Sequence, residues 1–263
     1  MKVGTKISLI LPTFLRASLL DLGLSSISKF KYAYPLEIVV VNDGIEDETE
    51  KVCDKYRKFF DIKYYFSGHR NIGNTPTFRV PGFAINIGVK RCTGDVIVLS
   101  CPEIYHLTNC LDKVGSLTLN GRYIIIPESM FFDNVGLVTS HLQKDQVTLP
   151  IDLFSSLSSG ALGSTAVKMP YLMGIQKAEF MAIGGYDEDF TGYAADDNDF
   201  VDRLVGFGLE YHRTDVRIIH LYHGKVSSPA GQPDNPAWVH NYNLYKSKKG
   251  TLIRNINREW GVL

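Results

Sequence analysis

Apolar runs alternate with helix-like segments through the first hundred residues of this 263-residue chain. The runs are rich in Val, Ile and Leu and cover residues 7–13, 36–41, 62–66 and 95–99. Segments with the spacing of amphipathic helices separate them, at residues 15–28, 46–59 and 82–92. Strands joined by helices of this length form βαβ units around a parallel sheet. The pattern therefore predicts an α/β fold with a mostly parallel sheet flanked by helices.

The second half of the chain is less regular. Further strands are expected at residues 122–127, 171–176 and 216–220, and helices at residues 177–183 and 196–207. Residues 152–166 are rich in Ser, Gly and Ala, which predicts a long mobile loop. We expect one α/β domain over residues 1–224, followed by a C-terminal extension over residues 225–263.

The charge balance restricts the kinds of partner. The 28 Lys and Arg residues equal the 28 Asp and Glu residues, so the formal net charge is zero. Binders of nucleic acid or of anionic membranes usually carry a basic surplus, so neither partner is expected. The sequence contains no apolar run of the roughly 18 residues that a membrane-spanning helix needs. Four cysteines without a C-x-x-C pair suit reduced thiols, which predicts a cytoplasmic protein, or one peripheral at a membrane.

Polar side chains follow the ends of the predicted strands. Thr13 ends the first strand, and Asp43 directly follows the second. In parallel sheets ligands bind at the carboxyl ends of the strands, where both residues are expected. The Asp43 carboxylate could accept hydrogen bonds from a base or a ribose hydroxyl, or it could simply form an Asx-turn that supports the next helix.

A second polar group follows the fourth strand. Glu103 and His106 offer an oxygen and a nitrogen three residues apart, a suitable pair for one divalent metal ion. His220 and His223, after a later strand, are further candidate ligands. Each of these residues is, by itself, equally compatible with an ordinary surface position.

Acidic residues gather at the start of one helix. The pair Gly184-Gly185 predicts a close backbone turn, and Asp196-Asp197-Asn198-Asp199 follows a short distance later. One helix N-cap needs one such residue, so four exceed that role. The helix dipole favours their ionised form, and an ionised carboxylate beside a sugar hydroxyl can act as a general base.

Taken in this order, the motifs resemble those of the family 2 glycosyltransferases, which have the GT-A fold, use nucleotide sugars and invert the anomeric centre. The resemblance extends from Ile7 to about His223. It rests on five segments, Leu11-Pro12-Thr13-Phe14-Leu15-Arg16, Val40-Val41-Asn42-Asp43-Gly44, Ala84-Ile85-Asn86-Ile87-Gly88 with Thr93-Gly94-Asp95-Val96-Ile97-Val98-Leu99, Gly184-Gly185-Tyr186-Asp187, and Asp196-Asp197-Asn198-Asp199. It implies a Rossmann-like sheet whose residues 1–106 bind the nucleotide sugar and whose residues 107–224 hold the acceptor and the catalytic base.

The resemblance also implies roles for individual residues. Asp197 would be the general base, with Asp196 and Tyr193 binding the acceptor. The groups implied for the nucleotide sugar are Pro12, Thr13, Asp43, Arg79 and Asn86, with Arg70 as the competitor of Arg79. The metal ligands would be Glu103, His106 and His220. The donor implied is a UDP-sugar, and the acceptor is a hydroxyl of a glycan, a lipid-linked precursor or a polymer, as in polysaccharide biosynthesis.

One motif departs from the family pattern. Where the family commonly carries Asp-x-Asp, this chain has Ser100-Cys101-Pro102-Glu103. A divalent ion, Mn²⁺ or Mg²⁺, would bridge the diphosphate in the family reaction. With a single carboxylate at this position, both a metal-dependent and a metal-independent reaction remain open.

Two other functions compete with this interpretation. A sugar nucleotidyltransferase on a similar sheet should carry a Gly-rich basic loop after the first strand, and residues 12–16 do not resemble one. A degenerate transferase that only binds nucleotide sugars or glycans has no need of a base, so the acidic pair Asp196-Asp197 argues against it.

Overall fold

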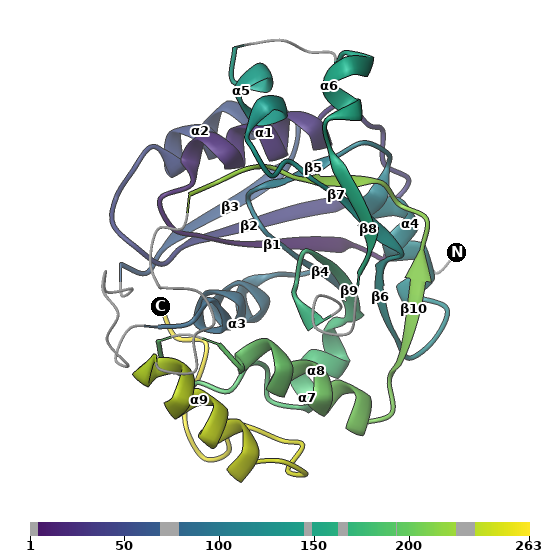
Figure 1. Ribbon diagram of the computed structural model, residues 1–263. Helices are drawn as coiled ribbons and strands as arrows, with labels where there is room; N and C mark the ends of the chain where they lie inside the picture. Colours follow the sequence, from purple (N-terminus) through teal and green to yellow (C-terminus); the bar gives the residue numbers. More distant parts are fainter. Residues whose placement is uncertain (1–4, 69–78, 145–148, 163–167, 193, 225–234) are drawn as a thin grey trace.

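A seven-stranded sheet forms the centre of the computed structural model, which describes residues 5–68, 79–144, 149–162, 168–192, 194–224 and 235–263 (Figure 1). In spatial order its strands are β10 (Glu210–Thr214), β6 (Tyr123–Pro127), β9 (Leu172–Gln176), β4 (Val96–Ser100), β1 (Ile7–Thr13), β2 (Leu36–Asn42) and β3 (Asp61–Phe66). β1 pairs in parallel with β2 and β4, and β2 with β3. The predicted mostly parallel sheet is therefore confirmed, although β9 runs antiparallel to both β4 and β6.

Helices cover both faces of this sheet. Figure 1 shows α1 (Ala17–Ile27) and α2 (Thr49–Tyr56) on one side and α3 (Pro81–Arg91) on the other, where α7 (Lys177–Ala182) and α8 (Asp196–Gly206) also lie. α4 (Cys110–Thr118) packs against β4, β6 and β9. The β-branched strands are buried from both sides, as their continuous apolar runs require.

A second, four-stranded sheet extends the fold beyond the carboxyl end of β4. Its strands, in spatial order, are β5 (Ile104–His106), β11 (Ile218–His220), β7 (Ser129–Phe132) and β8 (Ser158–Ala161). Two short helices, α5 (Leu137–Leu142) and α6 (Ile151–Ser155), lie beside it in Figure 1. The prediction of a structureless loop over residues 152–166 was wrong in the described part, which contains most of α6 and the whole of β8.

The described C-terminal residues pack against the domain. α9 (Pro236–Ser247) contacts α8, and residues 248–263 continue along the same side of the molecule. The Trp260 side chain packs on the main core beside Phe180, and the Arg254 guanidinium reaches Asp199 of α8 at 2.7 Å. Residues 236–263 therefore pack against α8 and support it.

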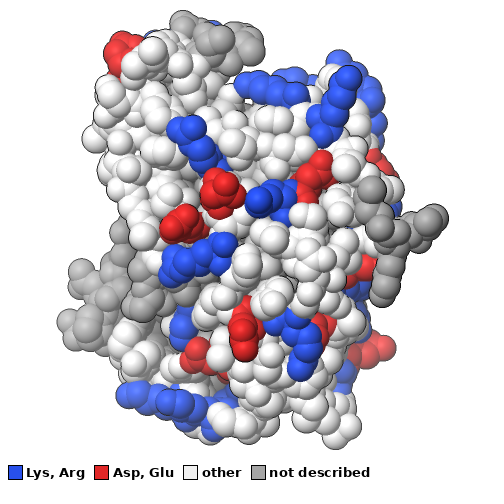
Figure 2. Space-filling model, turned by 90° about the vertical axis from the view of Figure 1, so that its right-hand side faces the viewer, with Lys and Arg blue, Asp and Glu red and all other residues white. Residues whose placement is uncertain are grey.

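Two surface properties follow from the described residues. None of their helices is long and apolar enough to cross a membrane. On the face shown in Figure 2, acidic and basic side chains are interspersed, as the zero formal net charge leads one to expect.

Candidate functional site

The carboxyl ends of β1, β2 and β3 meet at one edge of the large sheet. Thr13 pairs with Asn42 in the parallel register, and the Asp43 amide donates to the Thr13 carbonyl at 3.1 Å. The Ser67 amide, after β3, donates to the Asn42 carbonyl at 2.9 Å. Pro12 and Thr13 therefore lie beside Asp43, as the sequence predicted for the nucleotide side of the site.

Asp43 is buried at this edge and is held by two neighbours. The Ser67 hydroxyl donates to its carboxylate, and a guanidinium nitrogen of Arg79 lies 3.8 Å from the same oxygen. The Asx-turn considered for Asp43 is made instead by Asn42, whose side-chain oxygen accepts from the Gly44 amide at 3.2 Å. The Asp43 carboxylate thus lies between the Ser67 hydroxyl and the Arg79 guanidinium.

Arg79 connects this edge to the second half of the chain. Its guanidinium carbon lies 4.7 Å from the centre of the Phe83 ring, which fixes the side chain in a cation–π contact. Its backbone forms an isolated antiparallel bridge with Thr191. The competing candidate, Arg70, lies outside the described residues, and so does Tyr193.

Asn86 has a different environment from the one expected of a ligand-binding residue. It is fully buried in α3, where its side-chain nitrogen donates to the Tyr186 carbonyl and to the Glu188 carboxylate, both at 2.9 Å. Its side-chain oxygen accepts from the Tyr186 amide at 2.8 Å. The hydrogen bonds of the Asn86 side-chain amide thus join α3 to residues 186–188.

Glu103, His220 and His223 bring their ligand atoms together within 4.8 Å of one another, just beyond β4. The Nε2 atoms of His223 and His220 lie 3.2 Å and 3.9 Å from the same Glu103 oxygen. Arg16 approaches the other oxygen of Glu103 at 3.9 Å. The sequence named His220 and Glu103 correctly as neighbours, and it named His223 as a further candidate.

His106 does not join this group. It lies on β5 opposite Ile218, and the ligand cluster contains His223 in its place. Complete burial lowers the pKa of His106 to about 4, so its imidazole is neutral and enclosed. Its assignment as a metal ligand is therefore corrected, because the strand pairing that separates it from Glu103 is not visible in the sequence.

The pKa shifts of Glu103 and His220 suit a cation. Burial by itself would raise the pKa of Glu103, but the hydrogen bond from His223 and the charge of Arg16 hold that pKa below its usual value. Burial lowers the pKa of His220. An ionised carboxylate and a neutral imidazole are the forms that bind metal ions.

Backbone hydrogen bonds hold the cluster in place. The Leu221 amide donates to the Glu103 carbonyl at 2.9 Å, which ties the end of β11 to the segment after β4. The Asp133 amide donates to the His220 carbonyl at 3.0 Å, and the Tyr222 amide donates to the Thr139 hydroxyl at 2.8 Å. The second sheet therefore serves as the scaffold that places the two histidines against Glu103.

The acidic group at the start of α8 sits on an unusual backbone. Ala194 and Ala195, directly before Asp196, both have left-handed φ values, 73° and 69°. Non-glycine residues in this region cost about 1–3 kcal/mol each and cluster at functional sites. This backbone turns α8 so that Asp196 is buried and Asp197 is half-buried at its first turn.

Asp197 is bonded to a buried tyrosine. The Tyr186 hydroxyl donates to the Asp197 carboxylate at 3.0 Å, and the Tyr186 ring stacks on Phe200 with a centroid distance of 4.1 Å. Burial, followed by the nearby charge of Asp196, raises the pKa of Asp197 well above its usual value. A half-buried carboxylate of raised pKa is suited to accept a proton.

Cys101 directly follows β4. Burial raises the pKa of its thiol, and the nearby charges of Glu103 and Asp197 raise it further.

Buried ion pairs support α8 from behind. The predicted turn at Gly184 and Gly185 is confirmed by their φ values of 75° and 66°. Arg203 donates to the carbonyls of Ile183 and Gly185 and pairs with Asp199 at 2.7 Å. At the start of α8, Asp199 is therefore structural, whereas Asp197 is bonded to the Tyr186 hydroxyl.

Sequence reasoning did not assign roles to Arg16, Ser67 or Tyr186. Arg16 and Tyr186 stood inside the quoted motifs, so their position was visible but their partners were not. Ser67 follows directly after a predicted strand, which is the same signal that identified Asp43. The rule that ligands gather at strand ends could have found Ser67.

Comparison with known proteins gives two family matches. Residues 8–100 match the model "Glycosyl transferase family 2", and residues 171–225 match "N-terminal domain of galactosyltransferase". The first covers β1 to β4 with the Asp43 edge, and the second covers α8 with both histidines of the cluster.

Several curated proteins are similar to the chain. The chondroitin synthase of Escherichia coli is 29% identical over 255 residues, which cover 88% of this chain and 36% of the relative. The validoxylamine A glucosyltransferase of Streptomyces hygroscopicus subsp. jinggangensis is 25% identical over 226 residues, or 77% of this chain and 52% of the relative. This chain thus spans about half, or less, of the length of these relatives.

Solved structures share the fold. TarS 1-349 of S. aureus in complex with UDP-GlcNAc matches with a TM-score of 0.58 at 17% identity, over 93% of this chain and 66% of that one. The mannosyltransferase PcManGT of Pyrobaculum calidifontis, in complex with GDP-Man and Mn²⁺, matches with a TM-score of 0.54 at 15% identity, over 92% and 61%. Both are glycosyltransferases of the GT-A fold, which confirms the predicted fold class.

Proposed function

Since this chain belongs to the family 2 glycosyltransferases, we propose that it moves a sugar from a nucleotide sugar to a hydroxyl group of a glycan, lipid or polymer acceptor. The observations that carry this proposal are the cluster of Glu103, His220 and His223 just beyond β4, whose ligand atoms lie within 4.8 Å of one another, and the Asp197 carboxylate that Tyr186 holds at the start of α8. A base and a charge-neutralising centre are the two groups that such a transfer needs.

The reaction proceeds by a single displacement. The Asp197 carboxylate takes the proton of the acceptor hydroxyl, and the freed oxygen forms a bond to the anomeric carbon. The bond from that carbon to the diphosphate oxygen breaks, the nucleoside diphosphate leaves with its electron pair, and the anomeric centre is inverted. The Tyr186 hydroxyl orients the Asp197 carboxylate through its 3.0 Å hydrogen bond. Asp196 and Tyr193 bind the acceptor in this proposal.

The nucleoside binds at the other end of the site. Asp43 accepts hydrogen bonds from the base or the ribose, beside Pro12 and Thr13, and Arg79 faces the base or the phosphates. Support comes from the burial of Asp43 at the strand edge and from its 3.8 Å approach to Arg79. We propose a UDP-sugar as the donor; TarS is bound to UDP-GlcNAc, whereas PcManGT is bound to GDP-Man, so the two neighbours differ in nucleotide.

Glu103, His220 and His223 would hold a divalent cation. The set of one carboxylate and two imidazoles fits the group, and it suits Mn²⁺ better than Mg²⁺, which prefers oxygen ligands. When bound, such a cation neutralises charge on the diphosphate. This histidine pair compensates for the missing Asp-x-Asp motif. PcManGT, which is bound to Mn²⁺, supports the choice of metal.

The Asp197→Asn variant tests the base. We expect sugar transfer to fall at least about 100-fold, because a general base contributes that much and an amide cannot take the proton. The control is Asp215→Asn, whose side chain is 82% exposed and pairs only loosely with Lys113, at 3.7 Å. A folded Asp197→Asn protein that keeps most of its transfer rate would refute this role.

The His223→Gln variant tests the metal site. We expect Mn²⁺ affinity, measured from free Mn²⁺ by electron paramagnetic resonance without any nucleotide sugar, to fall at least about tenfold. His240→Gln, at an exposed position of α9, is the control and should bind Mn²⁺ as the parent does. Equal affinity in both variants would remove His223 from the proposed ligand set.

A further inference from the structure

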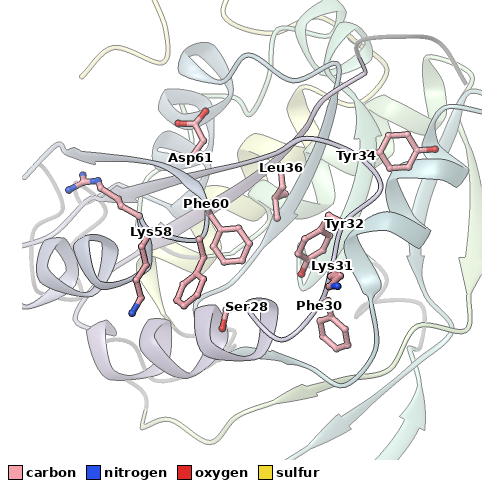
Figure 3. Close-up of a pocket in the computed structure, with 11 residues that line it drawn as sticks. Ser28, Phe30, Lys31, Tyr32, Tyr34, Leu36, Lys58, Phe60 and Asp61 are labelled. Atoms are coloured by element: carbon pink, nitrogen blue, oxygen red, sulfur yellow. The ribbon is translucent and has the colours of Figure 1, made fainter.

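A hollow of about 700 Å³ opens at the opposite edge of the large sheet from the candidate site (Figure 3). One wall is the connection between α1 and β2, and the other is the connection between α2 and β3. Leu36, the first residue of β2, and Asp61, the first residue of β3, both line it. The hollow therefore lies at the amino ends of strands whose carboxyl ends lead to Asp43.

Aromatic side chains form most of its apolar lining, namely Phe30, Tyr32, Tyr34, Phe59 and Phe60. Tyr32 and Phe60 meet edge to face with ring centroids 6.2 Å apart, and both pack on the main core. Phe59, by contrast, is 55% exposed. In the view of Figure 3, the Phe60 and Tyr32 side chains lie on either side of Leu36. The walls are thus held by the core, and a binding surface is formed in advance.

The charge at the rim is positive. Three basic residues, Lys31, Arg57 and Lys58, line the hollow. Arg57 pairs with Asp54, and the single acidic lining residue, Asp61, pairs with Lys6 at 2.9 Å. Within the described part of the chain, no carboxylate pairs with Lys31 or Lys58. The Lys58 ammonium lies 4.9 Å from the centre of the exposed Phe59 ring, so this cation and this ring form one surface, which together with Lys31 can meet an anionic ligand.

We propose that this hollow binds an acidic glycan. The C–H face of a sugar ring packs on exposed aromatic rings such as Phe59, and the carboxylates of the glycan meet Lys31 and Lys58. Single-stranded nucleic acid also stacks on aromatic rings, but it requires a long basic groove. A chain of zero net charge with two unpaired lysines at the hollow does not supply one.

We also infer that this glycan is the acceptor of the transfer, and this second step rests on the proposed function. The binding of the glycan to the hollow does not rest on it. The seven-residue strands β1 and β2 separate the two edges by about 20 Å. Only a polymeric acceptor can therefore contact both the hollow and Asp197. Transfer to short acceptors should not depend on the hollow.

The test is titration calorimetry in the absence of any donor. The probes are a hyaluronan decasaccharide, which carries carboxylates on alternate sugars, the neutral maltodecaose and the oligonucleotide (dT)10. The Lys58→Ala/Phe59→Ala variant removes one exposed cation and one exposed ring. The Lys249→Ala/Val239→Ala variant is the matched control. It changes two exposed positions, one in α9 and one just after it.

We expect the parent protein to bind the acidic decasaccharide more tightly than either other probe. The Lys58→Ala/Phe59→Ala variant should lose about tenfold or more of that affinity, and the α9 control should lose none. The site is refuted if the folded parent binds no decasaccharide, or if the two variants bind it equally. Tighter binding of (dT)10 would make it a nucleic-acid site instead.

The same variants separate this proposal from the proposed function. If no donor supports transfer while the Lys58→Ala/Phe59→Ala variant still loses decasaccharide affinity, the glycan site stands and the acceptor role falls. If transfer occurs and the variant binds the decasaccharide as the parent does, the proposed function stands and the glycan site falls.

Discussion

At the scale of single residues, the neighbours of Asp197 shift the pKa of its carboxyl group in opposite directions. Burial and the charge of Asp196 raise the pKa of its carboxyl group, while the hydrogen bond from the Tyr186 hydroxyl lowers it. These opposing effects act on a half-buried carboxylate at the first turn of α8. Tyr186 is therefore a positioning residue for the proposed base.

The Tyr186→Phe variant tests this balance. Transfer requires the ionised carboxylate, so the rate rises as the pH increases through the pKa of Asp197. Removing the hydroxyl removes a bond that favours the ionised form, so that pKa increases. We expect the acidic limb of the kcat/KM profile to move to higher pH, with a several-fold loss of rate below it.

A matched control is available in Tyr245→Phe, which removes a similar hydroxyl that donates to Asp202 and not to Asp197. Its pH profile should follow that of the parent. A Tyr186→Phe profile that also follows the parent would contradict the role of Tyr186, provided that the stacked ring still allows folding.

Residue types and order in the sequence predicted candidate site residues but could not assign the partner of each side chain. Asp43, Arg79, Glu103, His220 and Asp197 came from the positions of strand ends and from motif order. Asn86 was predicted on the nucleotide and His106 on the metal. In the structure Asn86 is bonded to Tyr186, and the cluster contains His223 in place of His106, because such contacts join residues far apart in the chain.

At the scale of elements, the start of α8 depends on the C-terminal segment. Arg254 is 4% exposed in its side chain and reaches Asp199 at 2.7 Å and Asp187 at 2.9 Å. Its removal would leave two buried carboxylates without this cation. For Arg254→Ala we expect the free energy of unfolding to fall by about 3–5 kcal/mol, measured by urea denaturation.

Lys51→Ala is the control for this effect. Its side chain is 77% exposed, and it pairs with Glu48, which is 68% exposed, at 2.8 Å. Exposed pairs contribute up to about 1 kcal/mol, so this variant should remain close to the parent. Equal losses in the two variants would show that burial of the Arg254 network does not stabilise the fold.

Long apolar runs in the sequence predicted the main strands and helices, whereas short strands and polar helices were not predicted. β1 lies where the sequence predicts it, and α8 differs by one residue at its end. β5 and β7 have only three and four residues, too few for a periodic signal. α9 carries aromatic and polar residues with few buried positions, so its helical pattern is weak. These are the elements that tertiary contacts stabilise.

At the scale of the whole molecule, two edges of one sheet have different chemistry. Asp43 and Glu103 follow the carboxyl ends of β2 and β4, while the amino edge carries an aromatic and basic hollow. The packing of residues 248–263 on α8 could not be predicted from the sequence, since it depends on ion pairs between segments about 55–70 residues apart. Fold class was predictable because it follows from the alternation of strands and helices alone.

The most direct test of the proposed transfer is calorimetric titration with UDP-, GDP- and CDP-sugars, each with and without Mn²⁺. We expect one UDP-sugar to bind tightly only when Mn²⁺ is present, and His223→Gln to lose that dependence. If folded protein binds none of these sugar nucleotides under either condition, the donor assignment is wrong and the likeness to glycosyltransferases is one of fold.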